Sequence, residues 1–473
     1  MATIAIIGAG LTGLTAAYRL KQQGHRVTVY EARERGGGAI MSVRRDGYLA
    51  ELGPSSLAAP SPTVARLLAD LGLDASRVTA SPAARHRYIV RKGRLSRLPM
   101  SPAELLTSRL LSNGAKLAIF MEPLLDVSDS HLEESIAAFV RRRFNQEVLD
   151  YIVNPFIAGI YAGDPEQLSL RHATPKLYAL ERTHGSVMKA LIQMMKAPRE
   201  GAHGAGPGGV MSFRGGLQEL PDALMRELSS EIRLRAQVTQ LRRGPSGWTV
   251  GAAFQTPEQF DAVIYAAPAH CLDEIDLDLA AAERLSTLAS IFHPPVAVVA
   301  LGFRREHVSH PLDGYGLLTP EIERKRILGV VFTSSLFPDR APAGHVLVTA
   351  FVGGTRDPDL VQADLQTLTA RVLDDLRSLL GTSGEPTFRA LQVWPKAIPQ
   401  YVLGYGRFKE VAEDVERRNA GLILAGTYRD GVSLGDAVAS AEQAVARTTE
   451  FLGAEGMANA GQSSAANVPA GPE

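Results

Sequence analysis

The sequence predicts an α/β protein with an α+β composite organisation: one domain on a parallel sheet, one on a mixed sheet, and an insertion of helices alone. Strand, helix and strand patterns follow one another in residues 3–30. Residues 98–196 carry almost only amphipathic helix patterns, separated by Pro, Asn or Gly. Residues 293–401 alternate strands with a helix. With 473 residues, 45% of them hydrophobic, the chain can form two or three domains.

The first element is a βαβ unit. An apolar strand at residues 3–7 and a helix at residues 11–22 precede a second apolar strand at residues 26–30. The turn after the first strand has the pattern G-x-G-x-x-G and consists of Gly8, Ala9, Gly10, Leu11, Thr12 and Gly13. Glycines here allow a tight turn, close approach of a pyrophosphate and packing of the helix on the strand. Because the helix N-terminus adds unpaired N–H groups and a positive dipole end, we expect a Rossmann-like dinucleotide-binding domain.

The residues after the second strand narrow the choice of dinucleotide. Glu31 stands where a carboxylate can accept hydrogen bonds from both ribose hydroxyls, and it would repel the 2′-phosphate of NADP. Arg35 precedes the glycine run 36–38, whose bare backbone can approach a second part of the cofactor while the guanidinium lies near its diphosphate. A non-binding glycine loop beside a solvated glutamate and arginine is the alternative.

Composition excludes several other classes of protein. The 50 basic and 50 acidic residues leave no net field for nucleic acid. The single cysteine, Cys271, rules out an intramolecular disulfide and a thiolate metal cluster, and no histidine pair has metal-ligand spacing. No apolar stretch is long enough to cross a bilayer, and residues 1–7 lack the pattern of a secretion signal. We therefore expect a cytoplasmic protein without a metal site, whose membrane contact, if present, is peripheral.

The rest of the chain completes the domain plan. A Gly- and Pro-rich stretch ends the helical region, and a helix at 217–228 is followed by short strands at 232–234, 238–241, 248–253 and 262–266. Further strands are expected at 296–303, 329–333, 346–351 and 422–425, with helices at 360–380 and 433–452. The predicted units are a dinucleotide-binding domain (1–62, 210–275 and 415–452), a substrate-binding domain (63–97 and 276–414), a helical domain (98–196), a flexible loop (197–209) and a disordered tail (453–473).

Short motifs in these segments resemble one known family. They are E-L-G-P-S at 51–55, R-H-R-Y at 85–88, G-I-Y-A-G-D at 159–164 with L-S at 168–169, R-G-G-L at 214–217, I-P-Q-Y at 398–401 and L-A-G-T-Y at 424–428. Together with the arginine and glycine run 35–38, and in the same order, they resemble the family of protoporphyrinogen oxidase and coproporphyrinogen III oxidase, which are FAD-dependent and amine oxidase-like. Three departures, Gly404-Tyr405, Gly435-Asp436-Ala437 and His184-Gly185-Ser186, leave the choice of porphyrinogen open.

The resemblance implies FAD as the cofactor and the flavin as the group that performs the chemistry, without a catalytic side chain. It also implies which residues surround FAD. Besides Gly8 to Gly13, Glu31 and Arg35, these are Ala32, Gly38, Ala39, Gly53, Pro54, Ser55, Ser56, Val238, Thr427, Val432, Ser433 and Leu434. The N-terminus of the closing helix would then stabilise the reduced flavin at its N1–C2 carbonyl edge.

The reaction implied by the resemblance is a step of porphyrin and haem biosynthesis. Protoporphyrinogen IX would be oxidised to protoporphyrin IX in three two-electron steps, with molecular oxygen reoxidising the flavin and hydrogen peroxide as product. Coproporphyrinogen III is the nearest alternative substrate. A flavin amine oxidase or carotenoid desaturase is more distant, and a flavin-binding scaffold without turnover is the alternative that is not an enzyme.

A porphyrinogen site needs apolar walls and a cation for the propionates. Arg87 is the expected cation, since its segment matches the family's propionate-binding segment. The basic run 85–97 around it could equally be a solvated hairpin or a patch that faces anionic lipid. The expected walls are Gly159, which would let the macrocycle approach the backbone, and Tyr315, Gly316, Leu318 and Phe351. Ordinary core packing is the alternative for these wall residues.

Two partner predictions concern the helical domain and assembly. Residues 105–125 are apolar enough to lie on a bilayer surface, as the resemblance implies, and a helical lid over the substrate cavity is the alternative. A homodimer is also among the assemblies that the resemblance allows.

Overall fold

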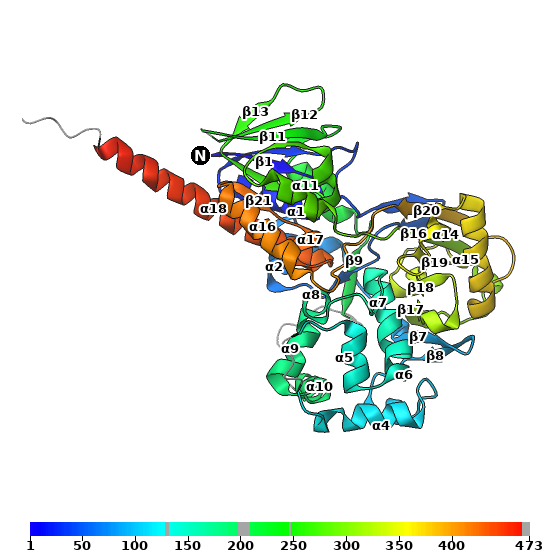
Figure 1. Ribbon diagram of the computed structural model, residues 1–473. Helices are drawn as coiled ribbons and strands as arrows, with labels where there is room; N and C mark the ends of the chain where they lie inside the picture. Colours follow the sequence, from blue (N-terminus) through cyan, green and yellow to red (C-terminus); the bar gives the residue numbers. More distant parts are fainter. Residues whose placement is uncertain (128–131, 197–208, 246, 466–473) are drawn as a thin grey trace, which may run out of the picture.

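The computed structural model describes residues 1–127, 132–196, 209–245 and 247–465. Figure 1 shows three bodies: a parallel sheet with its helices, a mixed sheet covered by helices, and a cluster of helices between them and below. The predicted fold class is confirmed. The predicted loop 197–209 lies outside the described residues except for Gly209.

The parallel sheet has the strand order β10-β2-β1-β14-β21, and every neighbouring pair is parallel. Its strands are β1 (Thr3–Ile7), β2 (Arg26–Tyr30), β10 (Ile232–Arg233), β14 (Ala262–Tyr265) and β21 (Leu422–Leu424). Both faces are buried, which suits their β-branched, apolar sequences. The predicted βαβ unit is confirmed, with α1 at Leu11–Gln22. Because the strands come from three distant segments, the sheet is discontinuous in sequence.

Helices cover this sheet on both sides. They are α1, α2 (Pro62–Asp70), α11 (Glu219–Glu227), α16 (Gly406–Arg418), α17 (Thr427–Asp430) and α18 (Leu434–Ala465). The prediction of a disordered tail from residue 453 is wrong for residues 453–465, which continue α18 away from the body (Figure 1). Residues 466–473 lie outside the described part.

Small sheets accompany the two large ones. A four-stranded sheet comprises β11 (Val238–Gly244), β12 (Gly247–Ala252), β13 (Glu258–Phe260) and β15 (Asp276–Asp278). A hairpin pairs β3 (Ser42–Arg45) with β4 (Tyr48–Glu51), and β9 (Val210–Phe213) pairs with β5 (Leu57–Ala58) and β6 (Arg77–Thr79). The hairpin packs on the mixed sheet, since Tyr48 and Ala50 lie in one apolar cluster with Ala300 and Leu347.

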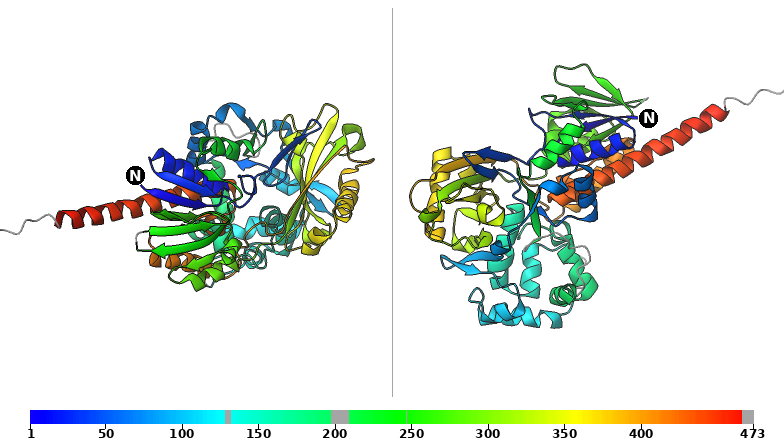
Figure 2. Two further views of the ribbon diagram at one scale, coloured as in Figure 1. Left: turned by 90° about the horizontal axis from the view of Figure 1, so that it is seen from above. Right: turned by 180° about the vertical axis from the view of Figure 1, so that it is seen from behind.

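The mixed sheet has seven strands in the order β20-β16-β19-β18-β17-β7-β8. They are β7 (His86–Arg91), β8 (Arg94–Arg97), β16 (Val296–Arg304), β17 (Gly314–Leu318), β18 (Ile327–Val331), β19 (His345–Gly353) and β20 (Phe388–Trp394). All pairs are antiparallel except β17 and β7, which join distant segments (Figure 2). The basic run 85–97 is thus a hairpin at the sheet edge.

One predicted helix of the mixed-sheet body is two helices. Residues 360–380 were expected to be continuous, but α14 (Pro358–Gln362) and α15 (Leu365–Leu380) are separated. Asp364 has an extended backbone and its carboxylate accepts a hydrogen bond from Thr367 N at 2.9 Å, so it caps a new helix. The short helix α13 (Thr333–Leu336) completes this body, whereas α12 (Leu285–Ala289) packs against α16 of the parallel-sheet body.

The helical insertion is confirmed. It comprises α3 (Pro102–Thr107), α4 (Asn113–Met121), α5 (Ile136–Arg143), α6 (Gln146–Val148), α7 (Asn154–Tyr161), α8 (Leu170–Ala173), α9 (Pro175–His184) and α10 (Val187–Lys196). A fully buried ion pair between Arg143 and Glu122 joins α5 to the end of α4. Glu122 also accepts hydrogen bonds from Val187 N and Met188 N, so the same carboxylate caps α10. Among the residues that the structure describes, no helix combines the length and the apolar character needed to cross a bilayer.

Candidate functional site

The glycine turn after β1 combines two tightly packed glycines with one open position. A Cβ atom on Gly13 would lie 1.9 Å from Gly8 O, so α1 can pack on the turn only without a side chain there. Gly8 has φ +103°, which favours glycine. At Gly10, the residue before α1, a Cβ would meet no atom within 4 Å. The N-terminus of α1 therefore faces open space, and the residues present fit the diphosphate of a dinucleotide.

Glu31 directly follows β2 and lies beside the glycine turn. Its two carboxylate oxygens accept hydrogen bonds from Ala9 N and Arg33 N, both at 2.9 Å. Each oxygen keeps a second lone pair that can accept a ribose hydroxyl. Ala236 N donates to Glu31 O at 2.8 Å, which brings the segment leading to Val238 beside the predicted ribose site.

Arg35 organises the loop in which it lies. Its guanidinium donates hydrogen bonds to the carbonyl oxygens of Gly36, Gly38 and Ile40 at 2.9–3.1 Å. Burial lowers the pKa of Arg35, and the positive charge of the nearby Arg33 lowers it further. The guanidinium thus holds the carbonyls of its own loop, and its approach to a diphosphate stays a prediction.

Close backbone contacts join this loop to the other predicted FAD-binding segments. A Cβ on Gly38 would lie 3.1 Å from Gly10 Cα, and one on Gly53 would lie 1.9 Å from Ala39 O. The segment 53–56, with Pro54, Ser55 and Ser56, is therefore continuous with the glycine turn through residues 38–39. Ala32 follows Glu31 directly.

The start of α18 contacts the start of α1. Thr12 Oγ1 donates to Ala437 O at 3.1 Å, which ties the first turn of α1 to the first turn of α18. Gly8, Glu31 and Gly426 each follow closely on a parallel strand, and the carboxyl ends of such strands meet at one edge of the sheet. The predicted residues Thr427, Val432, Ser433 and Leu434 belong to the same edge.

Four side chains come together on the mixed-sheet side. Arg87 Cζ lies 5.4 Å from the centre of the Tyr315 ring, and Tyr315 Oη is 3.1 Å from Ser56 Oγ. Tyr315 and Phe351 both pack on the cluster formed by Val331, Leu336, Phe337 and two alanines. The predicted cation and two predicted walls therefore adjoin the predicted FAD-binding segment at Ser56.

The remaining predicted walls have packing roles of their own. A Cβ on Gly159 would lie 3.0 Å from Leu318 Cδ2, so the end of a leucine side chain covers the glycine that was expected to face the macrocycle. A Cβ on Gly316 would lie 2.0 Å from Val330 O, so this glycine is required for pairing of β17 with β18. Their contact with a substrate stays a prediction.

Glu51 is a positioning residue that the sequence motif did not reveal. Although E-L-G-P belongs to a motif of the family it resembles, Glu51 is only 2% exposed and accepts hydrogen bonds from Ser42 Oγ at 2.5 Å and Leu217 N at 2.9 Å. Burial raises its pKa. It holds the R-G-G-L segment against the hairpin β3–β4. An acidic residue at the end of an otherwise apolar strand was the available signal.

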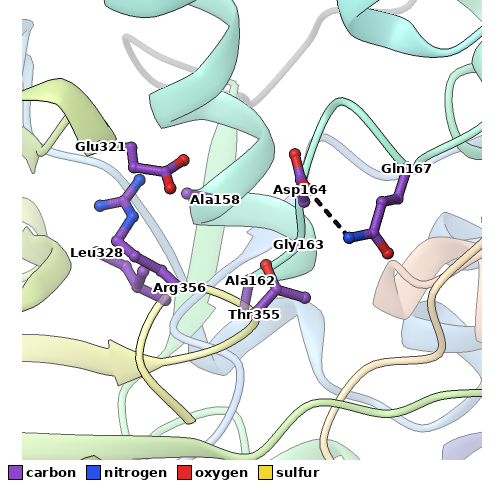
Figure 3. A pocket seen from close by; sticks show the side chains of 9 residues that line it. All are labelled: Ala158, Ala162, Gly163, Asp164, Gln167, Glu321, Leu328, Thr355 and Arg356. Atoms are coloured by element: carbon purple, nitrogen blue, oxygen red, sulfur yellow. Dashed lines mark hydrogen bonds between the residues drawn. The ribbon is translucent and has the colours of Figure 1, made fainter.

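A small polar pocket lies where α7 meets the mixed sheet (Figure 3). It has a volume of about 70 Å³, and its charged lining residues are Asp164, Glu321 and Arg356. Ligand pockets for drug-sized molecules measure about 300–1,000 Å³, so a macrocycle would not fit. None of the predicted substrate residues lines this pocket. Within the described ranges, no group of three or more His, Cys, Asp or Glu side chains could hold a metal ion.

An apolar face occurs at the far end of the helical domain. It is formed by the exposed side chains of Leu106, Leu117, Phe120, Met121, Leu124 and Leu125. Leu124 is 73% exposed and Leu117 is 61% exposed. Single exposed leucines are ordinary, but Leu117, Phe120 and Met121 share one side of α4, and exposed apolar groups of this kind mark interaction surfaces. Figure 1 places α4, which carries three of the six, at the end of the molecule away from the parallel sheet.

Comparison with known sequences gives two kinds of match. The family model for flavin containing amine oxidoreductase matches residues 11–449. Protoporphyrinogen oxidase 2, chloroplastic/mitochondrial, of Arabidopsis thaliana is 36% identical over 95% of this chain and 94% of its own length. Coproporphyrinogen III oxidase of Bacillus subtilis is 29% identical over 95% of this chain and 98% of its own length.

Solved structures agree on the fold. A protein of Exiguobacterium sp. 255-15, ascribed to the protoporphyrinogen oxidases, superposes with a TM-score of 0.81 at 25% identity and covers 95% of this chain and 99% of its own. Cyclohexylamine oxidase of Brevibacterium oxydans superposes with a TM-score of 0.68 at 17% identity and covers 95% and 99%. The second likeness supports the architecture alone.

Proposed function

The chain belongs to the family of flavin containing amine oxidoreductases, and we propose that within this family it oxidises protoporphyrinogen IX to protoporphyrin IX. It is an FAD-dependent oxidoreductase, as its family and its relatives indicate. The observation that carries the choice of substrate is the 36% identity to a protoporphyrinogen oxidase over 95% of the chain. Coproporphyrinogen III is the second candidate, favoured by the match to the Bacillus subtilis enzyme.

Different residues of the chain bind the cofactor and the substrate. The open space at Gly10 and the N-terminus of α1 bind the diphosphate, and Glu31 accepts the ribose hydroxyls. FAD, when bound, supplies the two-electron acceptor for each oxidation step. On the substrate side, Arg87 binds a propionate through its guanidinium, while Tyr315 and Phe351 exclude water from the apolar macrocycle.

A spectroscopic assay with both substrates tests this proposal. The purified, FAD-loaded protein is mixed with protoporphyrinogen IX or coproporphyrinogen III under air, and porphyrin fluorescence and hydrogen peroxide are followed. We expect a larger kcat/KM for protoporphyrinogen, with peroxide formed alongside porphyrin and little porphyrin formed without oxygen. Faster turnover of coproporphyrinogen would reverse the choice of substrate, and enzyme-independent rates with both would refute the oxidase function.

We also propose that the apolar face contacts a lipid surface from the cytoplasmic side, without crossing it. Six exposed apolar side chains on adjoining elements support this assignment. Sedimentation with phospholipid vesicles tests it. We expect the double variant Leu117→Asp and Leu124→Asp to stay in the supernatant, while the control Leu365→Asp, at a 61% exposed leucine of α15, sediments like the wild type. Equal sedimentation of both variants would contradict the proposal.

Two further partners follow from the same function. Molecular oxygen would be the final electron acceptor, which the oxygen dependence of the assay above measures. A homodimer would be detected by the molar mass in light scattering. A mass of about 50.7 kDa at micromolar concentration, the mass of one chain, would exclude a stable dimer.

A further inference from the structure

The short helix α17 lies between two glycines with unusual backbone angles. Gly426 has φ +122° and Gly431 has φ +123°, a region that favours glycine. These glycines separate α17 from β21 on one side and from α18 on the other. Neither regular element therefore continues into α17. The helix is held by its own side chains, Arg429 on Glu416 and Asp430 on Ser440, and by other side chains that bind its backbone.

Tyrosine hydroxyl groups provide much of this binding. Tyr401 Oη donates to Thr427 O at 2.5 Å and accepts from Gly431 N at 2.9 Å, so one hydroxyl bridges both ends of α17. Tyr405 Oη donates to Tyr428 O at 2.5 Å in the middle of the same helix. Gly426 N donates to Ser440 Oγ at 2.9 Å, which ties the glycine before α17 to α18.

Both tyrosines are held rigidly. Tyr401 is 2% exposed, Tyr405 is fully buried, and their ring centres lie 4.3 Å apart. Gln400 Nε2 donates to Tyr161 O at 2.8 Å, which ties the I-P-Q-Y segment to the end of α7. The hydroxyls are therefore presented to α17 from a packed cluster, and little conformational freedom remains to weaken their bonds.

The segment that Tyr401 holds leads directly into the predicted flavin contacts. Gly431, whose N–H binds Tyr401, precedes Val432, Ser433 and Leu434. Ser433 and Asp436 cap each other reciprocally at the start of α18, with Ser433 N to Asp436 Oδ2 at 3.1 Å and Asp436 N to Ser433 Oγ at 3.0 Å. The orientation of this first turn decides where its remaining N–H groups point.

We propose that Tyr401, supported by Tyr405, is a positioning residue that fixes the N-terminal turn of α18 toward the flavin and thereby sets the affinity for FAD and the electronic state of the bound flavin. This inference rests on the proposed function, because it requires FAD at the edge of the parallel sheet. Neither tyrosine needs to contact the cofactor.

The test compares two tyrosine hydroxyls of the same cluster. Tyr401→Phe removes both bonds to α17 and keeps the ring. Tyr161→Phe is the matched control, since Tyr161 Oη donates to Ala173 O at 2.6 Å and its ring lies 6.3 Å from that of Tyr401, but it does not bind α17. Each protein is stripped of FAD and titrated with it, and thermal stability, flavin absorption and steady-state kinetics are recorded.

We expect the FAD dissociation constant of Tyr401→Phe to rise by about two- to tenfold, as loss of one or two net hydrogen bonds predicts. Its flavin absorption bands should shift, and with saturating FAD its kcat should fall while the KM for porphyrinogen stays unchanged. Tyr161→Phe should lose stability without these changes. Equal FAD affinity in Tyr401→Phe and wild type, or an equal loss in both variants, would overturn the proposal.

A second variant and the behaviour of the wild type keep the test conclusive. If Tyr401→Phe does not fold, Tyr405→Phe takes its place, with a smaller rise in the FAD dissociation constant expected and no rise overturning the inference. Wild type that binds FAD but oxidises neither porphyrinogen would refute the proposed substrate and leave this inference standing on the titrations. Wild type that binds no FAD would refute both.

Discussion

Gly10, in the predicted cofactor site, differs in its surroundings from Gly159 and Gly316, in the predicted substrate walls. A Cβ on Gly10 would project into open space, whereas a Cβ on Gly159 would lie 3.0 Å from Leu318 Cδ2 and one on Gly316 would lie 2.0 Å from Val330 O. The proposed diphosphate site is therefore formed by backbone already in place. The proposed substrate site is lined by side chains, and the end of Leu318 would have to rotate before a macrocycle could approach Gly159. Backbone sites of this kind can be predicted from short motifs more readily than side-chain sites.

The largest effect is expected within the glycine turn itself. Gly13→Ala places a Cβ 1.9 Å from Gly8 O, a backbone atom that cannot move independently of β1. We expect a loss of about 1–3 kcal/mol of unfolding free energy from overpacking, together with loss of bound FAD. Chemical denaturation and the flavin absorbance of the purified protein measure the two. Wild-type stability with full FAD content would show that α1 does not pack as described.

Gly10→Ala sharpens the comparison, because the added methyl group meets no protein atom. Gly10 has φ −72°, which alanine adopts readily. We expect unchanged stability of the FAD-free protein but an FAD dissociation constant raised about tenfold or more, since the methyl occupies the space of the diphosphate. Titration with FAD, beside thermal unfolding without it, separates the two effects. Unaltered FAD affinity would place the diphosphate elsewhere.

On the substrate side the effect should fall on KM. Arg87→Ala removes the cation above the Tyr315 ring, and hydrogen bonds to charged groups contribute about 1.5–3 kcal/mol. We expect the KM for protoporphyrinogen to rise about tenfold with FAD affinity unchanged. Arg94→Ala, an exposed arginine of the same hairpin, is the control and should behave as wild type. A KM change of the same size in both variants would favour a general electrostatic role of the hairpin.

The smallest effect is expected in the pH dependence of stability, through His270, which follows β14 of the parallel sheet. Burial, helped by His293, Lys396 and Arg33, lowers the pKa of His270 to about 4, and its Nδ1 is buried without a hydrogen-bond partner among the described residues. In the unfolded chain His270 therefore takes up a proton near pH 6.5, whereas in the folded chain it stays neutral down to about pH 4. Stability is full above pH 6.5 and falls as the pH approaches 4. Thermal unfolding across this range should show a shallower decline in His270→Gln, and identical slopes would contradict the assignment.

The sequence predicted the βαβ unit to the residue, because the glycine motif, the two apolar strands and the helix periodicity all agree locally. The break between α14 and α15 was missed, since the cap at Asp364 interrupts a periodicity that continues across it. The roles of Glu51 and Tyr401 were missed for another reason. Their hydrogen-bond partners, Leu217 and Gly431, lie far along the chain, and no local pattern encodes such contacts.

The order of strands in the parallel sheet has a consequence for folding. Ile4 pairs with Ala262, and Val263 pairs in turn with Leu422, so strands from three distant segments of the chain are neighbours in one sheet. Until β21 pairs with it, β14 has an unpaired edge, which is a template for wrong pairing. Long-range pairing of this kind forms slowly. The parallel sheet should therefore be completed late in folding, when β21 covers this edge.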